Sequence, residues 1–276
     1  MKLTKLALLA LATLPRCVAA GACEAGTPNA ILQNASPKNW VLLGVGPSDV
    51  YVTGSSTVSG IGASYIGLAE AGSLTTTGPS SIQTGVLLNM TGQVRRSGES
   101  LIGVITQDED AAKYLGMARE DALSGSQCAA SLASTTQMNA GNMTIAADQT
   151  VNVVNLTDLI LINRTLTLSS HVQRDPPPTL ILNISGEFQM RGNSKIVLEG
   201  TLDELHVVFN VIGPGQDVIL SGDAGNEGQP SAEISGVLLA PLRAISVSSM
   251  QVNGTVIGGA GWIAITSGSQ VTRHLQ

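Results

Sequence analysis

The chain has 276 residues and a formal net charge of −6 at pH 7. Only 12% of its residues are charged and 3% are aromatic, whereas soluble proteins carry about 25% charged residues. The acidic balance and the absence of a basic cluster argue against nucleic-acid binding, which needs Lys and Arg to replace counterions. A core with so few aromatic residues has to be thin and filled by aliphatic side chains.

The first twenty residues have the pattern of a secretory signal peptide. Lys2 and Lys5 form a positive n-region, residues 6–14 are an apolar run, and small residues at 18–22 fit a cleavage site. The apolar run is too short to cross a bilayer as a stable helix. We therefore predict that residues 1–20 are a cleaved signal, that the protein is secreted or displayed at the cell surface, and that the mature chain has no transmembrane segment.

Two cysteines, Cys23 and Cys128, remain after removal of that signal. In an oxidising compartment they can form a disulfide that ties the new N-terminus to the middle of the chain. The alternative is lipidation of Cys23, because the sequence Ala-Gly-Ala-Cys that it ends loosely resembles a lipoprotein cleavage box. The usual Leu three residues before the cysteine is missing, and we favour the disulfide.

The mature chain is predicted to fold as one domain, residues 39–276, preceded by a loose N-terminal arm at 21–38. The arm is small and polar, with two prolines. From Trp40 to Val94, short runs rich in β-branched residues are bounded by Gly and Ser. This pattern is typical of short β-strands.

One segment has helical periodicity. Residues Thr106 to Glu109 have the spacing of a capping box, in which the Thr hydroxyl and the Glu carboxylate satisfy free N–H groups. Gly125 is placed to end the helix. Apolar residues recur between these signals at helical spacing, namely Ala111, Leu115, Ala118 and Ala122. We predict a helix near 107–124 that lies closely along a flat sheet with its Ala-rich side.

Beyond Met143 the alternation of apolar and polar residues is clearer. Few aromatics, many Gly and Thr, and Asn recurring near strand ends favour a solenoid, in which polar side chains can stack in ladders. The recurring residues are Asn152, Asn163, Asn183, Asn210 and Asn253. The prediction is a mainly β protein, an irregular, right-handed parallel β-solenoid with one long α-helix packed alongside. A β-sandwich is the alternative.

Four segments resemble the choice-of-anchor A domains of bacteria. Thr179–Gly186 looks like their strand ending in Asn-hydrophobic-Ser-Gly, and Val207–Val211 looks like their Phe-Asn strand. Ser235–Pro241 and Val252–Gly258 resemble their Gly-x-x-Leu-Ala-Pro and Asn-Gly-x-Val/Ile segments. The resemblance extends over residues 40–270. It implies a secreted or surface-displayed adhesive module whose ligand is extracellular matrix, a cell surface or a polysaccharide. The sequence ends without the anchor that usually follows.

The order of strands followed by one helix is also similar to the secreted ice-binding proteins of microbes. Ice binding needs a flat, regular face on which Thr, Ser and small residues hold ordered water. Candidates for such a face are Thr75, Thr76, Thr77, Thr165 and Thr167. Thr is also simply a good strand residue, so ice is the alternative ligand.

No catalytic motif is apparent. The three histidines are scattered, and the chain lacks a Gly-x-Ser-x-Gly elbow and a phosphate-binding Gly loop. We therefore predict no enzyme activity, no cofactor and no metal site. A solenoid polysaccharide hydrolase or lyase is the less favoured hypothesis. Its candidate catalytic carboxylates would be those of Glu187, Glu199, Asp203 and Glu204. A calcium loop at Asp223–Gly228 is explained better as a hydrophilic turn.

Overall fold

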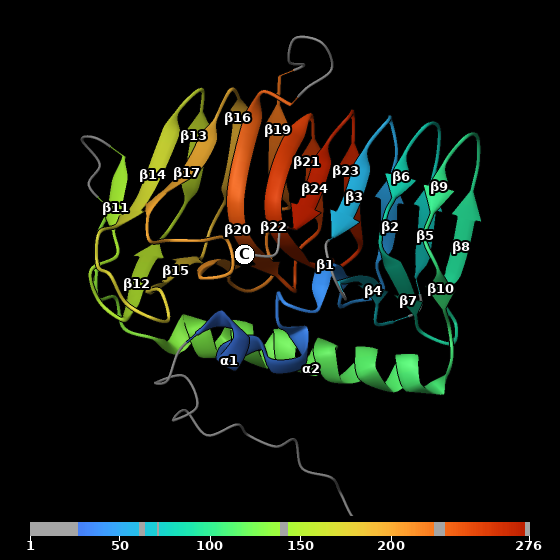
Figure 1. Ribbon diagram of the computed structural model, residues 1–276, viewed down its shortest axis with the longest axis horizontal. Coiled ribbons are helices and arrows are strands. Elements are labelled where there is room, and N and C mark those ends of the chain that lie inside the picture. Colours follow the sequence, from blue (N-terminus) through green and yellow to red (C-terminus); the bar gives the residue numbers. More distant parts are fainter. Residues whose placement is uncertain (1–26, 61–63, 71, 139–142, 224–229, 274–276) are drawn as a thin grey trace, which may run out of the picture.

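The computed structural model describes residues 27–60, 64–70, 72–138, 143–223 and 230–273. They form a β-solenoid with one long helix along its side (Figure 1). Its strands pair in parallel from coil to coil, whereas a β-sandwich pairs its strands antiparallel. The predicted solenoid with one helix alongside is confirmed.

The strands make three faces. The helix face contains β12 (Val151–Leu156), β15 (Thr179–Ile184), β18 (Val207–Val211), the second halves of β20 (Ala232–Ala240) and β22 (Met250–Gly258), β1 (Trp40–Gly44), β4 (Tyr65–Leu68), β7 (Gly85–Leu88) and β10 (Ile105–Thr106). The open face contains β13 (Leu159–Ile162), β16 (Phe188–Gly192), β19 (Val218–Gly222), β21 (Ile245–Ser248), β23 (Trp262–Thr266), β2 (Asp49–Val52), β5 (Ser73–Thr76) and β8 (Gln93–Arg96). The pocket face contains β11 (Thr144–Ala146), β14 (Thr165–Ser170), β17 (Lys195–Gly200), the first halves of β20 and β22, β24 (Gln270–Arg273), β3 (Thr57–Gly60), β6 (Ser81–Ile82) and β9 (Leu101–Ile102).

The coils do not stack in the order of the sequence. The first three coils run outward to the end formed by β8, β9 and β10. Helix α2 (Glu109–Ser131) then returns along the stack, and the remaining coils run back from β11 until the last one pairs with the first. A 23-residue helix is about 34 Å long at 1.5 Å per residue, which matches about eight strands stacked 4.8 Å apart. The helix therefore runs along most of the length of the solenoid (Figure 1).

Helix α2 begins and ends later than the sequence indicates. Its N-cap is Asp108, whose Oδ1 accepts a hydrogen bond from the Ala111 N–H at 2.7 Å, and Thr106 belongs to β10. Gly125 lies inside the helix rather than at its end. A Cβ at this position would lie only 2.9 Å from the Ile31 carbonyl oxygen, which explains why the residue is a glycine. It permits a close approach rather than ending the helix. The Ala-rich stripe is buried as predicted.

That close approach involves the segment expected to be a loose arm. Over its described part, residues 27–38, it forms α1 (Pro28–Leu32) and a 3-10 turn, η2 (Gln33–Ala35). Asn34 donates from its backbone and side-chain nitrogens to Asp121 Oδ2 on α2, at 3.0 and 2.8 Å. Ile31 and Leu32 are buried. The prediction of a loose arm is wrong here, because the short apolar run docks onto α2.

The core inside the coils is aliphatic. Its described cluster contains two aromatic residues, Phe188 and Phe209, whose rings stack 5.7 Å apart. A second cluster under α2 holds Trp40, which stacks on Tyr114 at 5.4 Å and meets Tyr65 edge-on at 6.5 Å. The prediction of a thin aliphatic core is therefore correct.

An asparagine ladder joins the helix face to α2. Asn155, Asn183 and Asn210 lie in register on β12, β15 and β18. Asn210 Nδ2 donates to Asn183 Oδ1 at 2.8 Å, and Asn183 Nδ2 donates to Asn155 Oδ1 at 3.0 Å. The same two amides donate to the helix carbonyls of Ser126 and Ala129. Of the five asparagines predicted for a ladder, Asn183 and Asn210 are in it, whereas Asn152, Asn163 and Asn253 lie elsewhere, and Asn155 was not predicted.

Candidate functional site

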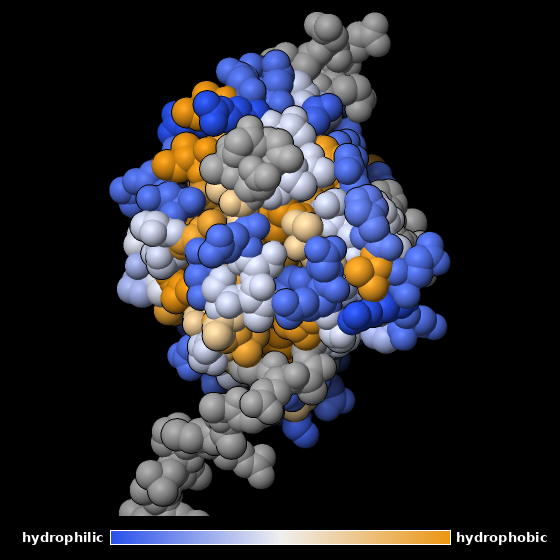
Figure 2. All heavy atoms as spheres, turned by 90° about the vertical axis from the view of Figure 1, so that its left-hand side faces the viewer, coloured by the Kyte–Doolittle hydropathy of each residue, from blue (hydrophilic) through white to orange (hydrophobic). Residues whose placement is uncertain are grey.

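The open face presents rows of outward side chains, because its eight strands pair without a register shift. One row consists of Ile160, Gln189, Ile219, Ser246, Ala264, Tyr51, Thr75 and Arg95. A second, the hydroxyl row, continues through Ser221, Ser248, Thr266, Thr53 and Thr77, all partly exposed. At the β13 end Ile160 and Ile162 are 45% and 56% exposed, and apolar surface is visible among polar atoms in the end-on view of Figure 2.

A repeated turn holds the hydroxyl row in place. At five corners a buried serine donates to the carbonyl oxygen three residues earlier, over 2.6 to 3.2 Å. These serines are Ser56, Ser80, Ser100, Ser194 and Ser269. Sequence reasoning missed this device, although four of the five corners have a Gly two residues before the serine, and the first three of these glycines follow one another at spacings of 24 and 20 residues. The turn therefore fixes the backbone of three members of the hydroxyl row, Thr53, Thr77 and Thr266.

Two aromatic rings interrupt the small side chains of the open face. Tyr51 and Trp262 lie on the adjacent strands β2 and β23, and both are partly exposed. The chain has seven aromatic residues, and the other five pack in the two clusters described above. These two are therefore the aromatics that internal packing does not use.

A fixed carboxylate lies beside the rings. Asp49 Oδ1 accepts hydrogen bonds from the Ser73 backbone N–H and hydroxyl, at 2.8 and 2.7 Å. These bonds, with the charge of Arg95 on β8, lower the pKa of Asp49, so its side chain is ionised at neutral pH. The Tyr51 hydroxyl lies 3.3 Å from Asp49 Oδ2, and this negative charge raises the pKa of Tyr51.

The five threonines predicted for an ice face do not form one surface. Thr75 points outward on the open face, and Thr77 belongs to the hydroxyl row. Thr76 is buried, and its hydroxyl donates to Ser100 Oγ at 3.1 Å. Thr165 and Thr167 point outward from β14 on the pocket face. Strand alternation reveals which residues point outward, but the corners decide which face they share.

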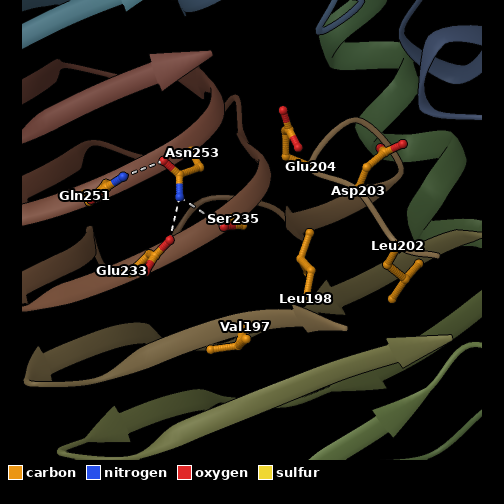
Figure 3. Close-up of a pocket in the computed structure, with 9 residues that line it drawn as sticks. All are labelled: Val197, Leu198, Leu202, Asp203, Glu204, Glu233, Ser235, Gln251 and Asn253. Carbon is orange, nitrogen blue, oxygen red and sulfur yellow. Dashed lines mark hydrogen bonds between the residues drawn. The ribbon is translucent and has the colours of Figure 1, made fainter. Parts of the chain in front are cut away.

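A cavity of about 430 Å³ opens on the pocket face (Figure 3). It is lined by Val197, Leu198, Leu202, Asp203, Glu204, Glu233, Ser235, Gln251 and Asn253. Figure 3 shows the polar side chains of β20 and β22 on one side and the leucines on the other. Asn253 Nδ2 donates to Glu233 Oε1 at 2.6 Å and to Ser235 Oγ at 3.3 Å.

The carboxylates considered for an enzyme are dispersed. Only Asp203 and Glu204 line the cavity, whereas Glu187 precedes β16 and Glu199 is exposed on β17. Asp203 Oδ1 is engaged by His206 Nδ1 at 2.6 Å and by the Leu205 N–H at 2.9 Å. Within the described ranges, no three His, Cys, Asp or Glu residues are grouped to hold a metal ion. The loop considered for calcium lies, after its first residue, outside those ranges.

The predicted signal peptide and Cys23 also lie outside the described residues. Cys128 lies in the last two turns of α2. Signal cleavage and the disulfide therefore stay predictions. In the part of the chain that the structure covers, no helix is long and apolar enough to span a membrane.

Residues 27–264 match the family model of the ice-binding-like adhesive domain. The chain belongs to this family. No protein with a curated description matches the sequence. The description of this family combines adhesion, which the resemblance to choice-of-anchor A domains implied, with likeness to ice-binding proteins, which the order of strands and helix implied. The predicted similarity to ice-binding proteins is confirmed.

Solved structures confirm the fold of this ice-binding-like adhesive domain. An ice-binding protein from the Antarctic ascomycete Antarctomyces psychrotrophicus matches with a TM-score of 0.53 and 16% identity, over 89% of this chain and 98% of its own. The DUF3494 domain of an ice-binding protein from Shewanella frigidimarina matches with a TM-score of 0.54 and 13% identity, over 86% and 95%. A glycosylated ice-binding protein from an Arctic yeast matches with a TM-score of 0.53 and 14% identity, over 89% and 94%. At these identities the likeness concerns the fold alone.

Proposed function

We propose that this domain is a secreted or surface-displayed adhesive module without catalytic activity, which holds a polysaccharide surface through its open face. The observation that carries the proposal is the pair of outward rings, Tyr51 and Trp262, beside the ionised Asp49. The family match supports an adhesive role. The side chains of the open face support a polysaccharide as the ligand.

Sugar rings offer flat C–H surfaces bordered by hydroxyl groups. Trp and Tyr supply a large apolar area with a polar atom at the edge, so they suit such a surface. Asp49 accepts from sugar hydroxyls, and Arg95 and Gln93, both exposed on β8, can donate to them. Because the carboxylate of Asp49 is already held by Ser73, little side-chain entropy is lost when a sugar binds.

Ice is the second candidate, and the hydroxyl row supports it. Adjacent strands place Thr53, Thr77 and Thr266 at a regular spacing of about 4.8 Å. The rings of Tyr51 and Trp262 and the long side chain of Arg95 break the regularity of the same face. A crystalline surface requires a uniform array, and we therefore favour the polysaccharide.

The test measures adhesion of the mature protein to insoluble cellulose, chitin and mannan. Trp262→Ala is expected to weaken binding to the preferred polymer by about 10-fold to 30-fold, the usual cost of losing an aromatic anchor. Gln189→Ala is the matched control, because Gln189 lies on the same row four strands away from Tyr51. Binding that is unchanged in Trp262→Ala would overturn the assignment of the open face.

The ice alternative has its own readout. Thr266→Tyr places a bulky ring in the hydroxyl row and leaves Tyr51 and Trp262 untouched. If the domain binds ice, the wild type forms faceted crystals and inhibits recrystallisation, and Thr266→Tyr loses both effects. Disc-shaped ice crystals with the wild-type protein would remove this alternative.

A further inference from the structure

The cavity on the pocket face exists because one corner of the solenoid is longer than the two corners that follow it in the stack. β20 and β22 turn from the pocket face to the helix face within a single strand, at Gly236 and Gly254 with φ of +143° and +140°. The coil below makes the same turn with a loop, residues 201–206, between β17 and β18. The loop stands beside the shorter corners, and the step between them forms the cavity.

The loop at residues 201–206 forms one wall of the cavity and is held in place by burial and hydrogen bonds. Leu202, Asp203 and Glu204 are only 8 to 9% exposed. Asp203 holds both His206 and the Leu205 N–H, as described above. Thr201 N–H donates to the Ser170 carbonyl at 2.9 Å, which fixes the loop to the next coil. Because the wall is held at several points, the cavity is present before a ligand arrives.

On the side of the cavity opposite the loop, polar side chains of β20 and β22 form a chain of hydrogen bonds that all run in one direction, from donor amide to acceptor oxygen. Gln251 Nε2 donates to Asn253 Oδ1 at 2.9 Å, and Asn253 Nδ2 donates to Glu233 and Ser235. The side-chain amides of Gln251 and Asn253 thus both donate to neighbouring side chains. Among the described residues, no group donates to the second carboxylate oxygen of Glu233 or to the amide oxygen of Gln251. The side chains of this wall therefore offer acceptors to a ligand.

The charge of the residues that line the cavity also favours a ligand that donates hydrogen bonds. The lining includes three carboxylates and no basic side chain. Arg273, near Glu204, is 2% exposed and does not line the cavity. Val197, Leu198 and Leu202 add an apolar wall. A fitting ligand donates several hydrogen bonds, carries no negative charge and has one apolar side, and a volume of 430 Å³ lies in the range of about 300–1,000 Å³ typical of small-molecule sites.

We propose that this cavity binds one neutral or amino-substituted pyranose residue of a glycan. Vicinal sugar hydroxyls donate to Glu233 and Gln251, and the C–H side of the ring packs on Val197 and Leu198. This site goes beyond the adhesive function proposed for the open face, because it lies on a different face and selects a single sugar residue.

The experiment uses the mature protein and ligand-observed NMR with glucose, mannose, galactose, N-acetylglucosamine, glucosamine and glucuronic acid as probes. At least one neutral or amino sugar is expected to bind, and glucuronic acid is expected not to bind. Glu233→Gln keeps the shape and removes the charge-assisted bonds, so the affinity should fall about 10-fold or more. Val197→Trp fills the cavity and should abolish binding.

Gln270→Ala is the matched control, because Gln270 lies beside Gln251 on β24 but does not line the cavity. Its affinity should equal that of the wild type. Thermal unfolding confirms that each variant is folded. The proposal is overturned if none of the neutral or amino sugars binds, if glucuronic acid binds best, or if both Glu233→Gln and Val197→Trp bind normally.

The two proposals fail separately. Trp262→Ala should weaken adhesion to insoluble polymer by the same factor of about 10 to 30 and leave the NMR signal of the soluble sugar unchanged. Conversely, Val197→Trp should leave polymer adhesion intact. If Trp262→Ala removes the soluble-sugar signal, the sugar binds at the open face and the cavity assignment is wrong.

Discussion

Asn183→Ala tests whether the asparagine ladder holds α2 on the solenoid. The side chain of Asn183 is 2% exposed and takes part in three hydrogen bonds, with Ala129 O, Asn155 Oδ1 and Asn210 Nδ2. At about 1 kcal/mol net for each bond, the substitution should lower the free energy of unfolding by about 3 kcal/mol. The Ala129 carbonyl then keeps only its hydrogen bond from the Leu132 N–H, at 3.2 Å.

The assay is equilibrium unfolding in urea, with the m-value compared between variants to confirm two-state behaviour. For a chain of this size, about 3 kcal/mol corresponds to a fall in Tm of roughly 6–12 °C. Asn155→Ala is the matched control, because Asn155 is exposed and contributes one ladder bond. It should cost about 1 kcal/mol or less.

The reasoning fails if Asn183→Ala costs no more than Asn155→Ala. It also fails if a double-mutant cycle between Asn183 and Asn210 shows no coupling, since residues joined by a buried hydrogen bond should couple by about 0.5 kcal/mol or more. Either result would mean that apolar packing of the Ala-rich stripe holds the helix without the ladder.

Three further predictions concern the corners and the N-terminus. Gly254→Ala should destabilise the fold by about 2 kcal/mol or more, because of its positive φ and a Cβ 2.1 Å from the Gly236 carbonyl oxygen; unaltered thermal unfolding would contradict this. Arg243 is 3% exposed and donates to five backbone carbonyls, so Arg243→Met should cost about 3–5 kcal/mol in urea unfolding and Arg243→Lys less. Cys128→Ser should lower stability by about 2–5 kcal/mol if the pair with Cys23 forms; mass spectrometry showing two free thiols in the secreted protein would refute the disulfide.

The local patterns of the sequence determined the elements. Alternating apolar residues predicted short strands, and the stripe from Ala111 to Ala122 predicted the helix against a sheet, because burial depends on the period of 2 or 3.6 residues. The helix end was misjudged because Gly125 serves contact with Ile31, a partner almost a hundred residues earlier. No local signal distinguishes that use of glycine from a C-cap.

The tertiary structure alone decided which coils are neighbours and which residues share a face. The first coil stacks on the last, so that Ser59 and Thr272 lie within 3.5 Å of each other. Thr75 and Thr165 have the same local pattern yet lie on different faces. Alternation sets only whether a side chain points in or out. The face depends on how many corners precede it, and the cavity depends on a loop of one coil meeting the glycine bends of the next, which is settled only when the whole stack is in register.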